Sequence, residues 1–308
     1  MSSRWAPLNW ERMTPAVRMI VVDIDGTLLG APGGEVSGRN RRALLEAEAA
    51  GIAIVIATGR RQAYAVPMIE PVGLKAETVF ITSNGTVTRT MSGERIDRVL
   101  LPIETARALC PALRSLGTTV FTFDREGPGE LVLESAEALE ARVSQWVEAN
   151  RASILEVRPL ERAFDSGEAP VQGMVCGSVE EMRAAEEWLA ESELAAAIEL
   201  HRTEYAARDL TILDILPPGC SKGSALERLA RQRGLDREQV VAIGDNWNDL
   251  EMLEFAGRPA VVANGAPDLV ELARKRKWEI APANDEDGVA RVIEEILSER
   301  QAATGIQG

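Results

Sequence analysis

Three short apolar runs near the start of the chain each end in small polar residues, and this pattern constrains the fold most. The runs are MIVVDIDGT at 19–27, AIVIATGR at 53–60 and TVFITSNG at 78–85. Between the first two, RNRRALLEAEAAG at 39–51 has apolar residues at helical spacing and ends in glycine. Continuous apolar strands separated by a helix are typical of a parallel sheet with both faces covered. The sequence therefore predicts an α/β fold with a doubly wound, Rossmann-like parallel-sheet core.

Four aspartates follow two of the predicted strands. Asp23 and Asp25 follow the first apolar run, and Asp245 and Asp249 lie in the later segment GDNWND. In such sheets ligands bind beyond the carboxyl ends of the strands, so these carboxylates should meet at one edge. Clustered carboxylates repel one another unless a cation neutralises them, and oxygen ligands suit a hard ion, Mg²⁺ above all. The sole histidine, His201, has no partners for a zinc site.

The same predicted edge offers ligands for a phosphoryl group. Thr58 has a hydroxyl, Gly59 an exposed backbone N–H, and Lys222 a cation at the start of a predicted helix. Because aspartate can form an aspartyl-phosphate, we expect one aspartate of the first pair to attack phosphorus and its neighbour to handle the proton. Each motif alone fits ordinary turn chemistry, but a purely structural explanation of the whole ordered set is disfavoured.

The middle of the chain has a different pattern. Three times a helix-like segment precedes two strand-like pieces, which predicts an open sheet carrying helices on one side. The segment LPPGCSKG at 216–223 is rich in proline and glycine and marks the return to the first pattern. The predicted divisions are an N-terminal extension at 1–18, a core at 19–87 and 217–308, and an inserted α/β cap domain at 88–216.

Charge and composition limit the partners. The net charge of −14 argues against nucleic-acid binding, which needs a basic surface. No apolar run approaches the roughly 18 residues that span a bilayer, and the N-terminus lacks the apolar segment of a signal peptide. We therefore expect a cytoplasmic protein with no membrane partner. Three scattered cysteines fit a reducing compartment and should be buried thiols: Cys110, Cys176 and Cys220.

These motifs resemble those of the haloacid dehalogenase-like hydrolase superfamily, and the layout is similar to its Cof-type branch (subclass IIB), which carries a large α/β cap after the third strand. DIDGT resembles the nucleophile motif, ATGR the phosphate-binding threonine motif, SKG the lysine motif and GDNWND the acidic metal motif. The resemblance covers about residues 19–298. It implies a Mg²⁺-dependent phosphatase, a monomer or homodimer, acting on a small phosphorylated substrate such as a sugar phosphate or phosphorylated cofactor.

The resemblance also implies a role for each matching residue. Asp23 would be the nucleophile and a metal ligand, Asp25 the general acid and base with its backbone carbonyl on the metal, and Asp245 the second carboxylate ligand. The phosphoryl oxygens would be bound by Thr58, Gly59 and Lys222. The supporting residues would be Thr27, Arg60, Asn84, Asn248 and Asp249.

One segment departs from the family pattern. Where the family reads like VAMGNAPEEVK, this chain reads VVANGAPDLVE. The Gly–Asn pair is inverted as Asn264–Gly265, Ala263 replaces the methionine, and Glu271 replaces the usual lysine. The departure leaves open the geometry of this loop and any substrate contact it makes.

Two alternative functions stay open at this point. A phosphomutase or phosphotransferase would use the same core, and a non-catalytic regulator would bind metal and phosphate only. The intact pair Asp23 and Asp25 argues against the regulator, because binding alone needs no proton-handling residue. In the cap, Arg125 and Arg202 could meet an anionic substrate, although surface salt bridges are the favoured use of both. The low aromatic content, 4%, weakly favours sugar phosphates over ring-bearing substrates.

Overall fold

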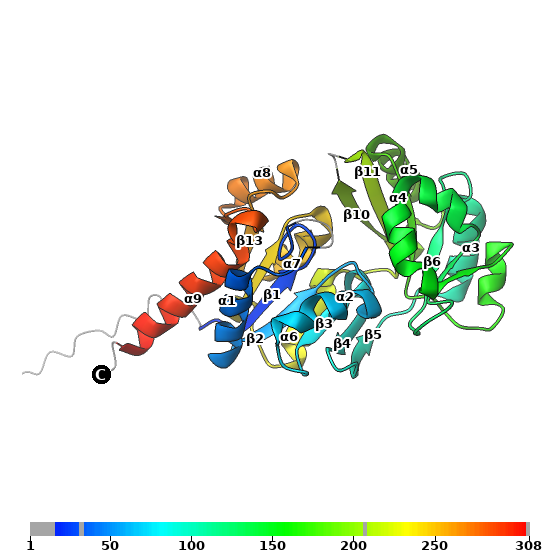
Figure 1. Cartoon of the computed structure of the whole chain (residues 1–308). Helices are drawn as coiled ribbons and strands as arrows, with labels where there is room; N and C mark the ends of the chain where they lie inside the picture. The colour runs from blue at the N-terminus through cyan, green and yellow to red at the C-terminus, as the bar shows by residue number, and fades with distance from the viewer. Residues whose placement is uncertain (1–15, 31–33, 206–207, 306–308) are drawn as a thin grey trace, which may run out of the picture.

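The protein is described by a computed structural model that covers residues 16–30, 34–205 and 208–305. Most of the predicted N-terminal extension, residues 1–15, lies outside the described residues. The described chain forms two sheets with their helices, which lie side by side in Figure 1. Among the described residues, no helix has the length and apolar character needed to cross a membrane.

The first sheet has eight strands in the order β14-β13-β12-β1-β2-β3-β4-β5. Its parallel strands are β1 (Met19–Asp23), β2 (Ala53–Ala57), β3 (Val79–Thr82), β12 (Val240–Gly244), β13 (Arg258–Val262) and β14 (Glu279–Ala281). The chain builds outward from β1 in one direction and then returns to build from β12 in the other. The reversal lies between β1 and β12, and ligands bind at such a switch point in open α/β sheets.

Helices cover both faces of this sheet. One face carries α1 (Gly38–Ala49), α2 (Gln62–Ile69) and α9 (Gly288–Gly305). The other carries α6 (Lys222–Gln232), α7 (Leu250–Phe255) and α8 (Pro267–Arg276). Strand β1 serves both faces, because Ile20 and Val22 pack against the first group whereas Met19 and Val21 pack against the second. The predicted doubly wound core is confirmed.

The second sheet has six strands in the order β10-β11-β9-β6-β7-β8. They are β6 (Val120–Thr122), β7 (Leu131–Leu133), β8 (Ile154–Glu156), β9 (Gln172–Gly177), β10 (Glu199–Tyr205) and β11 (Leu210–Leu216). The prediction of helices on one side only is wrong. Helices α3 (Ile103–Leu113) and α5 (Val179–Glu191) pack on one face, and α4 (Ala136–Asn150) packs on the other. Both faces of β9 are apolar, with Met174 facing α4 and Val175 facing α3 and α5.

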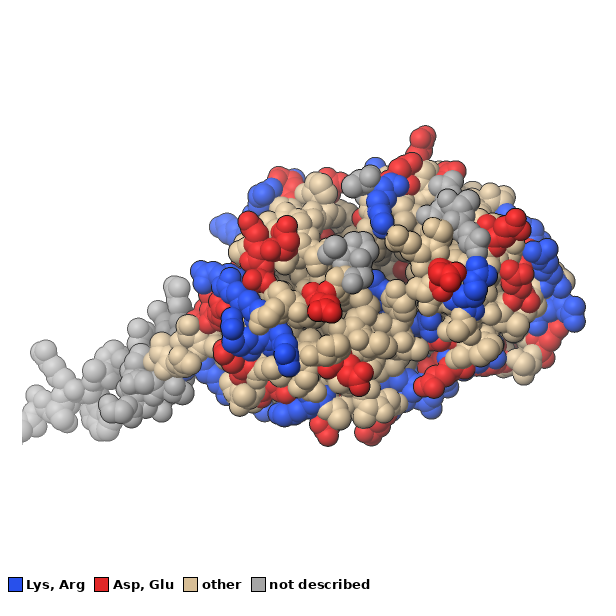
Figure 2. Space-filling view, viewed as in Figure 1, with Lys and Arg blue, Asp and Glu red and all other residues tan. Residues whose placement is uncertain are grey.

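The first sheet continues past residue 88, where the sequence placed the start of the cap. Strands β4 (Val87–Thr90) and β5 (Arg95–Arg98) pair antiparallel on β3 and extend its edge, so the predicted start is too early. The sequence of β5, RIDR, carries no apolar run because it is an exposed edge strand. Acidic and basic side chains are interspersed over the face seen in Figure 2, and the surface is hollowed between the two halves.

Candidate active site

A buried lysine joins two aspartates at the carboxyl end of β1. The Lys222 Nζ donates to Asp23 Oδ1 and to Asp249 Oδ1, each at 2.6 Å. Lys222 is the first residue of α6, and its position is set by Ser221, whose hydroxyl caps the helix. Burial alone would lower the pKa of Lys222, but the two carboxylates outweigh burial and raise it. Lys222 is therefore a fixed positive charge beneath Asp23.

The turn after β12 carries Asp249 and a third carboxylate, that of Asp245. Asp249 Oδ2 accepts from the backbone N–H groups of Asp245 and Asn246, at 2.9 and 3.1 Å, which shapes the turn after the strand. The Thr27 hydroxyl donates to Asp245 Oδ1 at 2.7 Å. Gly26 has φ +80°, and a Cβ there would lie 2.3 Å from Asp245 Oδ2, so glycine permits the close approach of these two turns.

Three buried carboxylates here form a cluster suited to a cation. Asp23, Asp245 and Asp249 each offer an oxygen, and these atoms lie within 4.8 Å of one another. Burial and the neighbouring aspartates raise the pKa of Asp23 to about 7 and raise that of Asp245, although Lys222 opposes both shifts. The negative charge thus exceeds what one lysine neutralises, and an all-oxygen donor set fits Mg²⁺.

The free oxygens of this cluster belong to Asp23 and Asp245. Both Asp249 oxygens already accept hydrogen bonds, from Lys222 and from the two backbone N–H groups. Within the described residues, neither Asp23 nor Asp245 has a hydrogen bond to Oδ2. Asp249 therefore mainly orients the lysine and the turn, and the carboxylates of Asp23 and Asp245, which accept fewer hydrogen bonds, could hold Mg²⁺.

The predicted phosphate-binding residues lie beside Asp23. Thr58 directly follows β2, whose Ala57 pairs with Asp23, and Thr58 is buried. Its hydroxyl accepts from the backbone N–H of Arg60 at 3.1 Å, which holds the turn containing Gly59. A Cβ at Gly59 would lie 3.1 Å from the Asn84 side chain.

Asn84 connects the two sheets at the site. It has left-handed backbone angles, φ 51° and ψ 34°, after β3. Its Nδ2 donates to Asp214 Oδ2 on β11 at 2.8 Å, and its Oδ1 accepts from Asn248 Nδ2 at 3.0 Å. Burial raises the pKa of Asp214 to about 7, with the hydrogen bond from Asn84 opposing.

Asp25 lies outside the buried cluster. Its carboxylate, about 29% exposed, accepts two hydrogen bonds from Arg60, both at 2.5 Å. The Arg60 guanidinium also stacks over the Tyr64 ring at 4.6 Å. Asp25 is thus partly exposed and held by Arg60, whereas Asp23, two residues earlier, is buried.

The segment that departs from the family pattern braces the loop after β1. Asn264 Nδ2 donates to the Gly26 carbonyl at 2.7 Å, and Asn264 Oδ1 accepts from the Asn284 N–H at 2.8 Å. Asn284 Nδ2 in turn donates to the Leu29 carbonyl at 3.0 Å. The side chain of Asn264 therefore supports the turn that carries Asp25 and Thr27.

A cavity opens above Asp23 and Asp25 and is closed by the second sheet. It holds about 160 Å³ and adjoins a wider one of about 520 Å³ that shares Asp25 and Arg60. We call the two together the chamber. Asp23 and Asp25 line it from the first sheet. We call these two residues, together with Lys222, Asp245 and Asp249 clustered around Asp23, the floor. The roof of the chamber comprises Gln172, Met174, Tyr205 and Ile212 on the second sheet and Trp146 on α4.

The two cap arginines do not line the chamber. Arg125 pairs with Glu168 at 3.0 Å, and Arg202 pairs with Glu186. The favoured interpretation of both as salt-bridge residues is confirmed.

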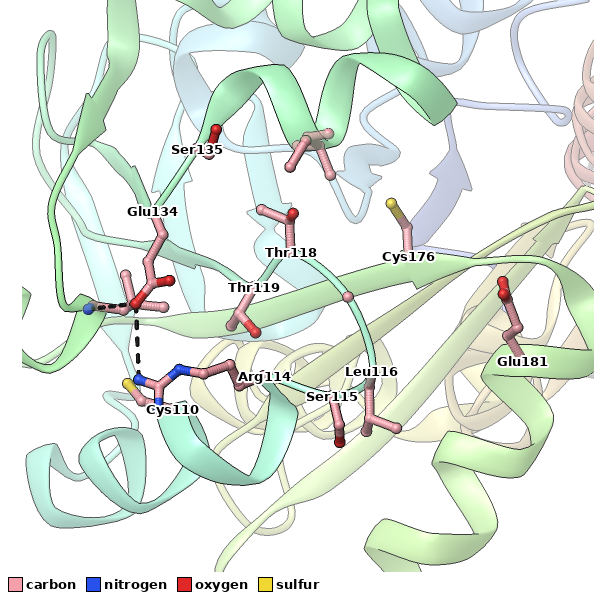
Figure 3. A pocket seen from close by; sticks show the side chains of 14 residues that line it. Cys110, Arg114, Ser115, Leu116, Thr118, Thr119, Glu134, Ser135, Cys176 and Glu181 are labelled. Carbon is pink, nitrogen blue, oxygen red and sulfur yellow. Dashed lines mark hydrogen bonds and ion pairs between the residues drawn. The ribbon is translucent and has the colours of Figure 1, made fainter.

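Another cavity, of about 470 Å³, lies between α3, α4 and the second sheet (Figure 3). Its lining cation, Arg114, pairs with Glu161 at 2.8 Å and approaches Glu134 at 3.8 Å. Burial raises the pKa of the Cys110 thiol to about 12, so this thiol is unreactive. The three predicted cysteines are all buried, and none of them forms a disulfide.

Comparisons with known proteins show which family the chain is similar to. The family model described as haloacid dehalogenase-like hydrolase matches residues 20–293. A 5-amino-6-(5-phospho-D-ribitylamino)uracil phosphatase of Bacillus subtilis is 29% identical over 304 residues, covering 93% of this chain and 100% of the relative. An HMP-PP phosphatase of Serratia proteamaculans is 30% identical over 257 residues, covering 83% and 87%. A solved haloacid dehalogenase-like hydrolase from Bacteroides thetaiotaomicron has a TM-score of 0.72 at 28% identity, covering 91% of this chain and 99% of that chain.

No motif in the sequence marks several residues of the site. Asp214 and Gln172 lie inside apolar strands of the second sheet, where no motif marks them. Tyr205 and Tyr64 could have been noticed because the chain has two tyrosines in all. Their shared position became visible only in the folded chain.

Proposed function

Because the chain belongs to the haloacid dehalogenase-like hydrolase family and is a phosphatase of that family, we propose that it hydrolyses small phosphate monoesters with Mg²⁺ through an aspartyl-phosphate on Asp23. The observation that carries the proposal is the state of the Asp23 carboxylate. One oxygen is bound to Lys222, the other has no hydrogen bond among the described residues, and Asp23 lines the chamber. That oxygen is available for attack on phosphorus.

The proposed reaction has two steps. In the first, Asp23 Oδ2 forms a bond to phosphorus, the ester P–O bond breaks, and Asp25 gives its proton to the leaving alcohol oxygen. In the second, Asp25 takes a proton from water, the water oxygen attacks the same phosphorus, and inorganic phosphate leaves with Asp23 regenerated. Arg60 orients Asp25 for both proton transfers.

The surrounding residues hold charge during both steps. Thr58, the Gly59 N–H and Lys222 would bind the phosphoryl oxygens. When bound by Asp23 and Asp245, with the Asp25 carbonyl as a further ligand, Mg²⁺ would offset the charge that develops on those oxygens. Asp249 would keep Lys222 directed at Asp23.

The substrate is proposed to be a small metabolite, because the two cavities of the chamber hold only about 160 and 520 Å³. One relative carries the name of a phosphatase acting on a phosphorylated uracil compound, which supports this class. The three buried thiols, none of which is in a disulfide, support a cytoplasmic location.

Phosphate release from a panel of phosphate esters would test the proposal. The panel would be measured with Mg²⁺, with EDTA, and with the Asp23→Asn variant, whose fold is checked by circular dichroism. We expect release that depends on Mg²⁺ and disappears in the variant. Release by the folded variant, or release unaffected by EDTA, would overturn the mechanism. Product analysis with added acceptor alcohols would identify a phosphotransferase, since such an enzyme turns over only when an acceptor is present.

A further inference from the structure

An aspartate interrupts the last apolar strand of the second sheet. Strand β11 reads LTILDIL, and its one charged residue, Asp214, is only 5% exposed. Burying a carboxylate is unfavourable unless hydrogen bonds or opposite charges compensate for the lost water. Among the described residues, the hydrogen-bond donor to Asp214 is Asn84 Nδ2, at 2.8 Å, which belongs to the first sheet. The burial of Asp214 is therefore offset by a contact that crosses from one sheet to the other.

The strand register directs Asp214 toward the floor. Asp214 lies directly opposite Met174 of the antiparallel neighbour β9, and residues opposite one another in such a pair share a face. Met174 lines the chamber, as does Ile212, which is two residues before Asp214 on the same strand. Strand β11 also leads directly back to the first sheet, since it ends at Leu216 and α6 begins at Lys222. Asp214 thus reaches the floor from the strand that precedes the lysine helix.

Asn84, which receives this contact, is bonded to two loops of the active site. It is fully buried, and its backbone N–H donates to the Thr58 carbonyl at 3.1 Å. Its Oδ1 accepts from Asn248 Nδ2 at 3.0 Å and lies 3.1 Å from where a Cβ of Gly59 would be. Asn248 belongs to the turn after β12, three residues after Asp245. Asn84 therefore connects the phosphate-binding loop with the turn that carries a proposed metal ligand.

The carboxylate of Asp214 determines which way the Asn84 side chain faces. A carboxamide has a donor end and an acceptor end, and rotation by a half-turn exchanges them. Because Asp214 accepts, the Nδ2 end of Asn84 faces the second sheet and the Oδ1 end faces Asn248. Without that acceptor the buried Nδ2 would be unpaired, which is unfavourable, and Asn84 would rotate or shift toward another partner. Either movement would disturb the bonds to Thr58 and Asn248.

We propose that Asp214 is a positioning residue of the active site. By fixing Asn84, it sets the phosphate-binding loop at Thr58 and Gly59 together with the turn that carries Asp245. Asp214 acts through these groups and not on the reacting atoms. This inference rests on the proposed phosphatase function and deepens it, because it makes the second sheet part of the catalytic arrangement in addition to a cover over the chamber.

The test removes the acceptor and then restores it. Asp214→Ala and Asp214→Asn would be assayed with acetyl phosphate, which is small, and with the most rapidly hydrolysed ester of the panel. For Asp214→Ala we expect kcat to fall about tenfold with both substrates while KM changes by less than about twofold, because the phosphoryl group still binds but the loops around it are displaced. Asp214→Asn keeps an acceptor for Asn84, so its kcat should stay within about threefold of the wild type.

Asp124→Ala is the matched control, because Asp124 is another aspartate that crosses from the second sheet to the first. It lies after β6 and pairs with Arg89 at 2.7 Å, Arg98 at 3.0 Å and Arg95 at 3.5 Å, on β4 and β5. Asp124 lines neither cavity of the chamber. Its removal takes away more ion pairs between the sheets than Asp214→Ala does, yet kcat should stay within about twofold of the wild type.

A second variant and a second measurement cover the case in which Asp214→Ala fails to fold. Asp214→Leu removes the acceptor but fills the space, and it should show the same fall in kcat. Amide hydrogen exchange measures the positions of the loops without any turnover. We expect protection at residues 58–60 and 245–249 to fall in the folded Asp214 variant that lacks the acceptor and to be unchanged in Asp124→Ala.

The outcomes distinguish this inference from the proposed function. A fall in kcat that Asp214→Asn recovers and Asp124→Ala does not share supports the positioning role. An equal fall in Asp124→Ala would assign the effect to docking of the two sheets, and a change confined to KM for the larger ester would make Asp214 a substrate contact; either result overturns the inference, as does unchanged kcat. Absence of wild-type turnover with acetyl phosphate and every ester counts against the phosphatase function itself, and the exchange measurement then decides the positioning of the loops separately.

Discussion

The polar side chains of the floor are hydrogen-bonded to protein groups, whereas the roof contains a buried polar group without a partner among the described residues. On the floor, Lys222 bonds two aspartates, Asp249 bonds the lysine and two backbone N–H groups, and Thr27 bonds Asp245. On the roof, Gln172 is buried with an unpartnered oxygen among aromatic and apolar side chains. The floor is arranged before any substrate arrives, as electrostatic stabilisation of a reacting phosphoryl group requires. The roof, by contrast, presents a buried carboxamide oxygen that has no partner among the described residues.

The largest expected effect is on kcat, and it follows from substituting Asp25, the proposed proton-handling residue of the floor. We expect Asp25→Asn to lower kcat about 10²–10⁴-fold, because the amide cannot donate or accept the proton of the leaving group. Stabilisation by Mg²⁺ should persist, since the Asp25 carboxylate lies outside the cluster of Asp23, Asp245 and Asp249. Turnover and thermal shift with Mg²⁺ would be measured together. Unchanged turnover would contradict the proton-handling role given to Asp25.

Removing the lysine should destabilise the floor as a whole. Lys222→Met leaves two buried carboxylates without their cation, and loss of one partner of a buried ion pair lowers the free energy of unfolding by about 3–5 kcal/mol. Urea unfolding near pH 7 without metal would measure the loss, and added Mg²⁺ should recover part of it. Lys275→Met is the control, because Lys275 is exposed on α8. This substitution should change the free energy of unfolding by under about 0.5 kcal/mol. Equal unfolding free energies for the two variants would contradict the role given to Lys222.

The same contrast explains what the sequence could predict. Asp23 ends β1, and Thr58 and Asp245 directly follow β2 and β12. Because parallel strands end at one edge, the order of these motifs along the chain predicted that the three residues lie together. Lys222 instead begins α6, and it was assigned to the same edge as a cation at a predicted helix start. The hydrogen-bond partners of these residues, by contrast, depend on how the side chains pack in the folded chain. That Lys222 binds Asp249 as well as Asp23, and that Asp25 faces Arg60, needed the packed structure.

The roof was less predictable for a physical reason. Gln172, Tyr205 and Trp146 come from two strands and a helix that meet only when the second sheet forms. Whether a strand residue faces the chamber or α3 and α5 depends on register, and both faces of β9 are apolar, so alternation gave no signal. For the same reason the position of α4 on the chamber side was missed.

A smaller effect tests the link between roof and floor at Asp214. Its pKa is raised to about 7 by burial, so between about pH 4 and 7 the folded protein keeps a proton that the unfolded chain has released. Stability therefore falls as pH rises through this window, by at most about 1.4 kcal/mol per pH unit for one group. The Asp214→Asn variant keeps the acceptor for Asn84, and its free energy of unfolding should fall less steeply with rising pH than that of the wild type. Parallel stability curves from pH 4 to 8, measured by urea unfolding, would contradict this account.

The smallest expected effect concerns the support of the floor by Asn264. Asn264→Ala removes the hydrogen bonds to the Gly26 carbonyl and from the Asn284 N–H, each typically contributing about 1 kcal/mol. Because these bonds hold the turn that carries Asp25, we expect kcat to fall roughly fivefold with KM for acetyl phosphate nearly unchanged. Glu271→Ala is the matched control, since Glu271 also departs from the family pattern but forms only exposed ion pairs on α8, which contribute little. A fall in kcat shared by both variants would mean that the segment acts through general stability, whereas a fall confined to Asn264→Ala would show that the inverted Asn–Gly pair positions the proton-handling residue.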